Sequence, residues 1–314
     1  MSNESRVIVA GVGDLQADDP ALVAAAALAR RAGAVLHLVH AYELPRLLGT
    51  SPQLRAFPEA AEAYRANALR QLEAAAARAG AASSSCRVME GSPGACLLEA
   101  AKETGAELLV VGAARGKRLS RMVLGSTAQR VLRQAPVPVL VVRRALQGPV
   151  GRLLVTGDMS ELSAAVFEAA LATLRHLLGG PGEVRALYVL PWSLLPPPLP
   201  HSALEEAARK QLAECLAHRP DHGFEVEPQV RVGEPAEQIV AEAEAWQAEL
   251  LVVGTHARGW GARLLLGSVA EATLRDAPCN VLAVPPTYAA APEIEPTCVE
   301  SLELESWAQA AGVP

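Results

Sequence analysis

The sequence has few aromatic residues and no excess of positive charge, and both shortages argue against nucleic acid as a partner. Only 4% of the 314 residues are Phe, Trp or Tyr, too few for the stacked bases that single-stranded nucleic acids present. The formal net charge is −6, whereas proteins that bind nucleic acid nonspecifically need an excess of Lys and Arg. We therefore expect no nucleic-acid partner.

Cysteine pairs, metal-ligand clusters and nucleophile motifs are also missing. An odd number of cysteines without CxxC spacing argues against a disulfide framework: Cys86, Cys96, Cys215, Cys279 and Cys298. His, Cys and carboxylate residues nowhere show metal-ligand spacing, and no GxSxG nucleophile elbow occurs. The sequence thus offers no catalytic residues and no metal site.

Long apolar runs are absent as well. No run approaches the ~20 residues that a membrane span requires. The N-terminal segment MSNESRVIVA lacks the basic and then apolar layout of a signal peptide. We expect a cytoplasmic protein without a membrane partner.

What the sequence does contain is an internal repeat. The segments 106–144 and 248–286 share landmarks that lie 142 residues apart: Gly112 and Gly254, Gly125 and Gly267, Pro136 and Pro278. A repeat of this length indicates a duplicated domain, and a chain with 51% hydrophobic residues can fill two cores. We place the domains at 1–148 and 149–288, followed by an acidic tail at 289–314.

Each half reads as strands alternating with helices. The runs 108–111 and 250–253 are apolar without alternation, which suits strands buried on both faces of a parallel sheet. The other expected strands are 6–12, 34–41, 86–90 and 137–142, then 152–157, 183–190, 226–232 and 281–284. Expected helices lie between them, the first beginning at an Asp18-Asp19-Pro20 cap and ending near residue 32. This order predicts an α/β protein: two tandem, doubly wound, Rossmann-like domains, each a five-stranded parallel sheet with helices on both faces.

Two short motifs in each half predict an anionic ligand. Gly112 and Gly254 directly follow a buried strand, and open α/β sheets bind ligands where their strands end. Gly125-Ser126 and Gly267-Ser268 stand just before a helix, where a hydroxyl and unbonded backbone N–H groups can receive an anion. Phosphate is the expected group.

These motifs, the repeat and the strand order resemble the tandem universal stress proteins over residues 5 to 286. Nucleotide-binding members of that family carry G-x2-G-x9-G-[ST] after the fourth strand and an aspartate after the first. The resemblance implies ATP, with or without Mg, or a related adenine nucleotide such as cyclic AMP, bound mainly in the second domain. Asp158 would then meet the adenosine, and the backbone of Val189 would face the adenine. The implied site comprises Asp158, Val189, Gly254, Thr255, His256, Ala257, Gly267, Ser268 and Val269.

Both domains depart from the family pattern, the first more than the second. Ala257 replaces the middle glycine of the second domain, which costs on the order of 1 kcal/mol, about fivefold in affinity. In the first domain Arg115 takes that place and Val12 stands where the aspartate belongs, so Asp14 could serve only if the loop slips by two residues. The resemblance therefore implies a degenerate second site, made of Gly112, Arg115, Gly125, Ser126 and Thr127.

Three functions follow from the resemblance. The first is a stress-response module that binds an adenine nucleotide and regulates an unknown protein partner. A nucleotide-free scaffold is the alternative, and a slow ATPase using His256 and Arg258 is a third. The strands at 137–142 and 281–284 would pair within one chain as a pseudo-dimer, which could form a homodimer in turn.

Overall fold

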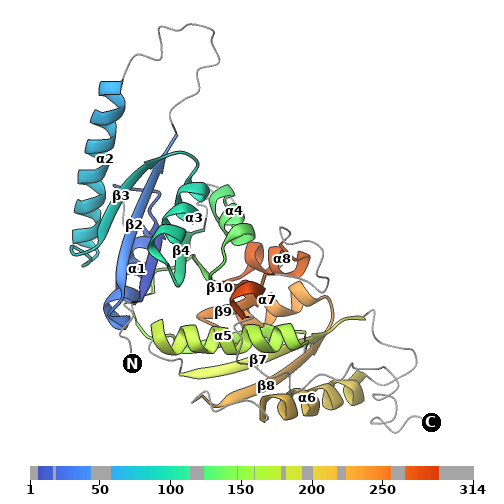
Figure 1. Ribbon diagram of the computed structural model, residues 1–314. Helices are drawn as coiled ribbons and strands as arrows, with labels where there is room; N and C mark the ends of the chain where they lie inside the picture. The colour runs from blue at the N-terminus through green and yellow to red at the C-terminus, as the bar shows by residue number, and fades with distance from the viewer. Residues whose placement is uncertain are drawn as a thin grey trace, which may run out of the picture. The chain divides into compact units, whose positions relative to one another are not determined.

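The computed structural model describes residues 6–16, 19–43, 58–113, 124–146, 148–158, 160–177, 182–192, 201–217, 224–255 and 266–289. The chain divides into two units, Met1–Gly148 and Pro149–Pro314. We call them unit 1 and unit 2 and describe each by itself (Figure 1).

Unit 1 contains one parallel sheet with the strand order β3-β2-β1-β4-β5. Its strands are β1 (Val7–Gly11), β2 (Val35–Tyr42), β3 (Ser85–Glu90), β4 (Leu108–Gly112) and β5 (Val139–Val142). β5 begins two residues later than expected, because Pro136 and Pro138 have no N–H group to donate to a sheet.

Unit 2 repeats this order as β8-β7-β6-β9-β10, and its neighbouring strands are again parallel. Its strands are β6 (Arg152–Gly157), β7 (Glu183–Leu190), β8 (Val226–Val232), β9 (Leu250–Gly254) and β10 (Asn280–Val284). The predicted fold, two doubly wound five-stranded α/β domains, is confirmed.

The helices follow the strands in the expected alternation. Those of unit 1 are α1 (Pro20–Ala32), α2 (Pro58–Arg78), α3 (Pro93–Thr104) and α4 (Ser126–Gln134). Unit 2 has α5 (Glu161–Leu177), α6 (His201–Ala217), α7 (Pro235–Ala245), α8 (Ser268–Asp276) and the short α9 (Pro286–Ala289). Only α9 was not predicted. Within the described ranges no helix is both long enough and apolar enough to cross a membrane.

The first helix shows how local sequence sets an element's ends. The Asp19 carboxylate accepts a hydrogen bond from the N–H of Ala21 at 2.8 Å, and Pro20 occupies the first helical position, where a missing N–H group costs nothing. Gly33 ends the helix in the left-handed conformation with φ of 61°, which glycine adopts readily. The predicted cap of this helix is confirmed.

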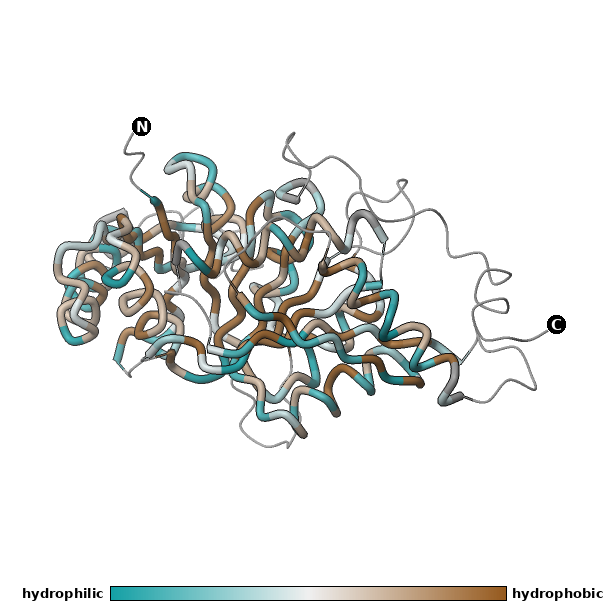
Figure 2. The backbone as a smooth tube through the Cα atoms, turned by 90° about the horizontal axis from the view of Figure 1, so that it is seen from below, coloured by the Kyte–Doolittle hydropathy of each residue, from teal (hydrophilic) through white to brown (hydrophobic). Residues whose placement is uncertain are grey.

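The core of each unit is built on its central strands. Leu109 of β4 and Leu251 of β9 have no exposed surface, and their neighbours in these strands are also buried. Figure 2 colours several inner segments of the backbone as strongly hydrophobic. The absence of alternation in the two runs thus reflects burial on both faces of the sheet.

One position after a helix differs between the units and gives a stability prediction. Gly105 follows α3 with φ of 64°, whereas Gln247, 142 residues later, follows α7 with φ of 55°. A side chain in this left-handed region costs on the order of 1 kcal/mol. We expect Gln247→Gly to stabilise unit 2 by about 0.5–1 kcal/mol, since the hydrogen bond that it removes, from Arg152 Nη1 to Gln247 Oε1, is long at 3.5 Å.

Tryptophan fluorescence during urea unfolding measures this effect selectively. All tryptophans lie in unit 2: Trp192, Trp246, Trp260 and Trp307. The matched variant in unit 1 is Gly105→Ala, expected to destabilise by about 1 kcal/mol and followed by circular dichroism. A Gln247→Gly variant that unfolds at lower urea than the wild type would show that the Gln247 side chain contributes more than its backbone strain costs.

Candidate functional site

A cavity of about 520 Å³ lies where the strands of the unit 1 sheet end. The chain runs from β1 outward to β2 and β3 on one side, and β4 and β5 lie on the other side of β1. The ends of β1 and β4, at residues 11–14 and 111–113, both line the cavity. It therefore occupies the switch point of the sheet, the place where open α/β sheets bind ligands.

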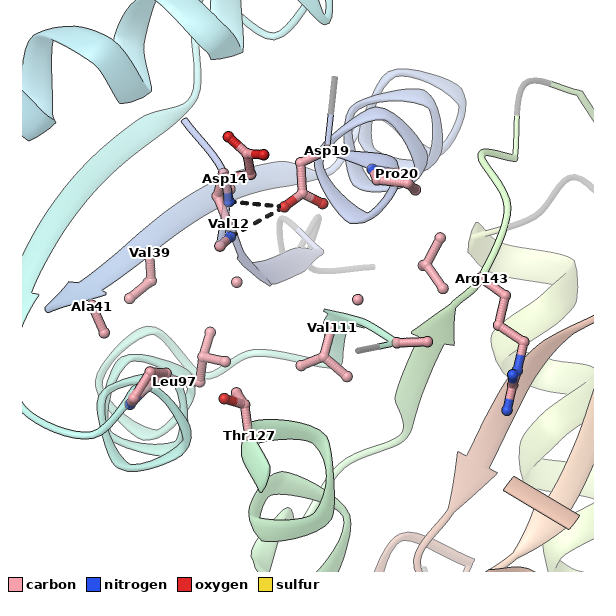
Figure 3. A pocket seen from close by; sticks show the side chains of 16 residues that line it. Val12, Asp14, Asp19, Pro20, Val39, Ala41, Leu97, Val111, Thr127 and Arg143 are labelled. Atoms are coloured by element: carbon pink, nitrogen blue, oxygen red, sulfur yellow. Dashed lines mark hydrogen bonds between the residues drawn. The ribbon is translucent and has the colours of Figure 1, made fainter. Parts of the chain in front are cut away.

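The cavity wall is mainly apolar with a few polar groups (Figure 3). Its polar side chains are Asp14, Asp19, Thr127 and Arg143. A Cβ atom at Gly11 would lie 2.8 Å from Cδ1 of Leu97, so glycine at the end of β1 lets this α3 side chain form part of the wall. An apolar cavity of this size with few polar groups is typical of a small-molecule site.

Hydrogen bonds at the amino-terminal ends of the strands establish which residues of the two units correspond. Glu107 N donates to Val7 O at 2.9 Å, and Glu249 N donates to Arg152 O at 3.0 Å. Glu107 and Glu249 lie 142 residues apart, so Val7 corresponds to Arg152 and β1 is matched to β6 at a spacing of 145 residues. The pairing of β1 with β4 and of β6 with β9 has the same register.

This correspondence corrects the sequence alignment at the aspartate. The counterpart of Asp158 is Gly13, and not Val12 as expected from the sequence, so Asp14 lies one position further along instead of two. Aligning the two sequences pairs Gly11 with Gly157, the last residues of β1 and β6. Because β6 is one residue longer than β1, this pairing is shifted by one residue. Only the inter-strand hydrogen bonds reveal this extra residue.

The same reasoning relates Val189 to a residue of the cavity. Gly91 N donates to Tyr42 O at 2.9 Å, and Gly233 N donates to Leu190 O at 3.0 Å. Tyr42 therefore corresponds to Leu190, and Val189 corresponds to Ala41, which lines the cavity. The residue expected at the adenine in unit 2 thus has its counterpart in the cavity wall of unit 1.

The structure brings some of the predicted site residues together and leaves others undescribed. In unit 1, Gly112 and Thr127 line the cavity. In unit 2, Gly254 ends β9, Thr255 is 1% exposed, and Val269 lies in the first turn of α8. Arg115, His256, Ala257 and Arg258 lie outside the described residues.

Ser126 and Ser268 lie one position further into the helices than predicted. They are the first residues of α4 and α8, and the N-caps are Gly125 and Gly267, with φ of −65° and −60°. A glycine cap has no side chain to bond the first N–H groups of its helix. No cap side chain therefore bonds the first backbone N–H groups of α4 and α8, and such groups at a helix N-terminus are suited to receive an anion.

In unit 2 a hydrogen bond joins the residue after β9 to the residue before α8. Thr255 N donates to Val284 O at 3.1 Å, and Gly267 N donates to Thr255 O at 2.9 Å. The start of α8 therefore lies directly beside the end of β9. The N–H group of Gly267 is used in this contact, so Ser268 and Val269 supply the next N–H groups along the helix.

Two serines orient the Asp158 carboxylate at the start of α5. Its Oδ1 atom accepts hydrogen bonds from Ser160 N, from the Ser160 hydroxyl and from the Ser163 hydroxyl. The Asp158 N–H group donates to Ser163 Oγ at 2.8 Å. The carboxylate is thus held at the strand end in a fixed direction.

Asp19 contacts the end of β1, whereas the sequence predicts it only as a helix cap. Its Oδ2 atom accepts hydrogen bonds from Gly13 N at 3.1 Å and from Asp14 N at 3.4 Å (Figure 3). Asp19 lines the cavity and is 8% exposed. An aspartate before a proline signals a helix start but not a contact with a strand end, so the sequence held no sign of this role.

The described residues contain no group of three or more His, Cys, Asp or Glu side chains that could hold a metal ion.

Comparison with known proteins agrees with the tandem organisation. The model of the Universal stress protein family matches twice, over residues 4–143 and 149–285. A universal stress protein of Mycobacterium bovis is 30% identical over 202 residues, which cover 62% of this chain and 69% of that protein. One of Methanocaldococcus jannaschii is 31% identical over 140 residues, 42% of this chain and 81% of that protein.

Solved structures show the same fold over nearly the whole chain. A putative universal stress protein of Pseudomonas aeruginosa has a TM-score of 0.62 at 19% identity and covers 98% of each chain. A universal stress protein of Archaeoglobus fulgidus has a TM-score of 0.60 at 19% identity, covering 90% of this chain and 99% of that one. At these identities the likeness concerns the fold alone.

Proposed function

The chain belongs to the universal stress protein family, and from this premise we propose that it binds an adenine nucleotide where the sheet strands end, mainly in unit 2, as a regulatory module of the stress response. The observation that carries the proposal is the Asp158 carboxylate. It follows β6, which pairs with β9 at the switch point of the unit 2 sheet, and two serines orient it there.

The residues around Asp158 fit the parts of a nucleotide. A carboxylate accepts hydrogen bonds from ribose hydroxyls, and such charge-assisted bonds are stronger than neutral ones. The first turn of α8, with Ser268 and Val269, offers backbone N–H groups and the positive end of a helix dipole to phosphate. Bound ATP would supply the negative charge and the adenine ring that these groups recognise.

The test is a titration of the full chain with Mg-ATP, with Asp158→Asn as the variant. Asparagine keeps an oxygen that can accept from Ser160 and Ser163 but loses the charge. A hydrogen bond to a charged group contributes about 1.5–3 kcal/mol, so we expect the affinity of the unit 2 site to fall by about 10- to 100-fold. At ten times Kd, wild-type protein should gain about 1.4 kcal/mol and melt roughly 3–5 °C higher.

Asp276→Asn is the matched control, because it removes one carboxylate from the last residue of α8, at the far end from the proposed phosphate contacts. It should bind like the wild type. Wild-type protein that shows no thermal shift at millimolar ATP, and that releases no nucleotide on denaturation after purification, would favour the nucleotide-free scaffold.

A further inference from the structure

We infer that unit 1 carries a second nucleotide site in which Asp19, the N-cap of α1, replaces the strand-end aspartate as the acceptor for the ligand's hydroxyl groups. This inference rests on the proposed function and deepens it. The sequence pattern implied a degenerate site because the strand-end position lacks an aspartate. The structure shows that position to be Gly13, with a carboxylate beside it.

In both units the residue at the end of the first strand contacts a side chain near the start of the following helix, but the carboxylate comes from the strand end in unit 2 and from the helix cap in unit 1. In unit 2 the strand end supplies the carboxylate and the helix supplies the hydroxyl: Asp158 N donates to Ser163 Oγ, which donates to Asp158 Oδ1. In unit 1 the corresponding N–H group, that of Gly13, donates to Asp19 Oδ2 at 3.1 Å. Both units therefore place one carboxylate next to the same backbone N–H group at the switch point.

The backbone that carries Gly13 is fixed from the other side of the strand. Val12 N donates to Val39 O at 2.9 Å. His40 Nδ1 lies 2.9 Å from Val12 O, and because a carbonyl oxygen only accepts, this nitrogen carries the proton. The end of β1 is thus held to β2, and Asp19 faces a preformed wall.

Asp19 has acceptor capacity for a ligand. A carboxylate offers about four acceptor positions, and three hydrogen bonds from backbone N–H groups occupy Asp19: those of Ala21, Gly13 and Asp14. One position is left for a hydroxyl group that enters the cavity. Because the side chain is 8% exposed, its charge is poorly screened by water, and a hydrogen bond to it is correspondingly strong.

Asp14, which the sequence suggests as a substitute for the missing strand-end aspartate, is less suited than Asp19 to accept a hydrogen bond from a ligand. Its Oδ1 atom accepts from Gln16 N at 2.9 Å in a local turn. Figure 3 shows its carboxylate turned away from Leu97 and Thr127, whereas that of Asp19 points to the strand end. Asp14 is thus the competing acceptor with which Asp19 is compared in the experiment below.

The first turn of α4, where the phosphate groups would bind in unit 1, is at least as favourable for an anion as the first turn of α8 in unit 2. The first turn of α4 contains no acidic residue, whereas Glu271 lies in the first turn of α8. A carboxylate at this position opposes a bound anion. Thr127, in the first turn of α4, lines the cavity, so the helix start and Asp19 border the same space.

The experiment is calorimetric titration of the full chain with Mg-ATP, counting sites in a set of variants. Wild type should bind two ATP molecules per chain, and Asp158→Asn should keep one at unchanged affinity. In the Asp158→Asn background, Asp19→Ser should weaken the remaining site by about 10- to 100-fold. Serine keeps the helix cap, and circular dichroism and melting would verify the fold. Asp14→Ala in that background should weaken binding less than Asp19→Ser does, because Asp14 lines the cavity but its carboxylate accepts a hydrogen bond in a local turn.

A rescue variant separates the carboxylate's role in binding from its role in the fold. A Cβ atom at Gly13 would lie 4.0 Å from Asp19 Oδ2 and meet nothing closer, so the site has room for a side chain. Gly13→Asp combined with Asp19→Ser rebuilds the unit 2 arrangement and should restore binding in the Asp158→Asn background. Its helix cap equals that of Asp19→Ser alone, so any gain in affinity comes from the carboxylate.

The outcomes distinguish the two proposals. If wild type binds one ATP and Asp158→Asn binds none, the proposed function stands and the second site is refuted. If wild type binds no ATP, both are refuted. Full-strength binding after Asp19→Ser, or a larger loss of affinity after Asp14→Ala than after Asp19→Ser, would also overturn the role of Asp19.

Discussion

Replacing Glu242 with alanine is expected to lower the free energy of unfolding of unit 2 by about 3–5 kcal/mol. Glu242 lies on α7 and is 3% exposed. Its Oε1 atom accepts from Arg185 Nη1 at 2.6 Å, and its Oε2 atom accepts from Arg231 Nε. With alanine, Arg231 would lose its ion pair and Arg185 would keep only the exposed Glu227, and poorly compensated charge is costly away from water.

An exposed partner of the same arginine gives the control. Glu227 accepts from Arg185 Nη2 at 2.7 Å, but its side chain is 57% exposed. Exposed ion pairs contribute about 0–1 kcal/mol, so Glu227→Ala should cost no more than that. Urea unfolding followed by tryptophan fluorescence compares the two variants, because all tryptophans lie in unit 2. Equal losses for both would mean that burial does not determine the strength of this ion network.

Unit 1 shows how the network can be replaced. The residues of unit 1 that correspond to Arg185, Arg231 and Glu242 are His37, Met89 and Ala100. Exchanging a buried ion network for packed, less polar residues is often neutral or stabilising. The triple variant Arg185→His, Arg231→Met, Glu242→Ala should therefore recover most of the stability that Glu242→Ala loses. A triple variant as unstable as the single one would show that unit 2 lacks the packing of unit 1 at this place.

Alanine at Leu250 and at Leu251 is expected to destabilise unit 2 by about 2–5 kcal/mol in each case. The two residues are adjacent in β9, and neither has exposed surface. Successive strand residues point to opposite faces of a sheet, so the two substitutions create cavities in different layers of the core. Similar losses at both positions are the signature of a strand covered on both faces.

The edge strand β8 provides the comparison for this result. Val226 is only partly buried, so Val226→Ala should cost about 1 kcal/mol or less. The three variants are compared by their urea midpoints in tryptophan fluorescence. A loss below about 1 kcal/mol at Leu250 or Leu251 would contradict burial on both faces, and with it our interpretation of the apolar run.

Local sequence was sufficient to predict most of the fold. The runs at 108–111 and 250–253 predicted central strands because strands buried on both faces have no polar positions. Asp19 and Pro20 predicted the start of α1 because a cap acts over a single turn. The start of β5 and the short helix α9 were missed, since prolines near a strand start and a four-residue helix leave weak local signals.

The site was predictable only in part. The sequence identified Gly112 and Thr127, which line the cavity, because a motif after a strand marks the ligand-binding edge of the sheet. It misaligned Asp158 with Val12, because β6 is one residue longer than β1 and no local feature shows the extra residue. It also placed the two serines before their helices instead of inside the first turns.

By itself the sequence determined the duplicated α/β domains, the alternation of strands and helices and the strand ends where ligand binding is expected, because these follow from the internal repeat, the hydrophobic period, the helix caps and the chain direction. Tertiary structure alone decided that Gly13 corresponds to Asp158, that Asp19 supplies the unit 1 carboxylate, and that Glu242 pairs with two arginines. Each depends on contacts between segments separated along the chain, and the register of those contacts is set by inter-strand hydrogen bonds and packing.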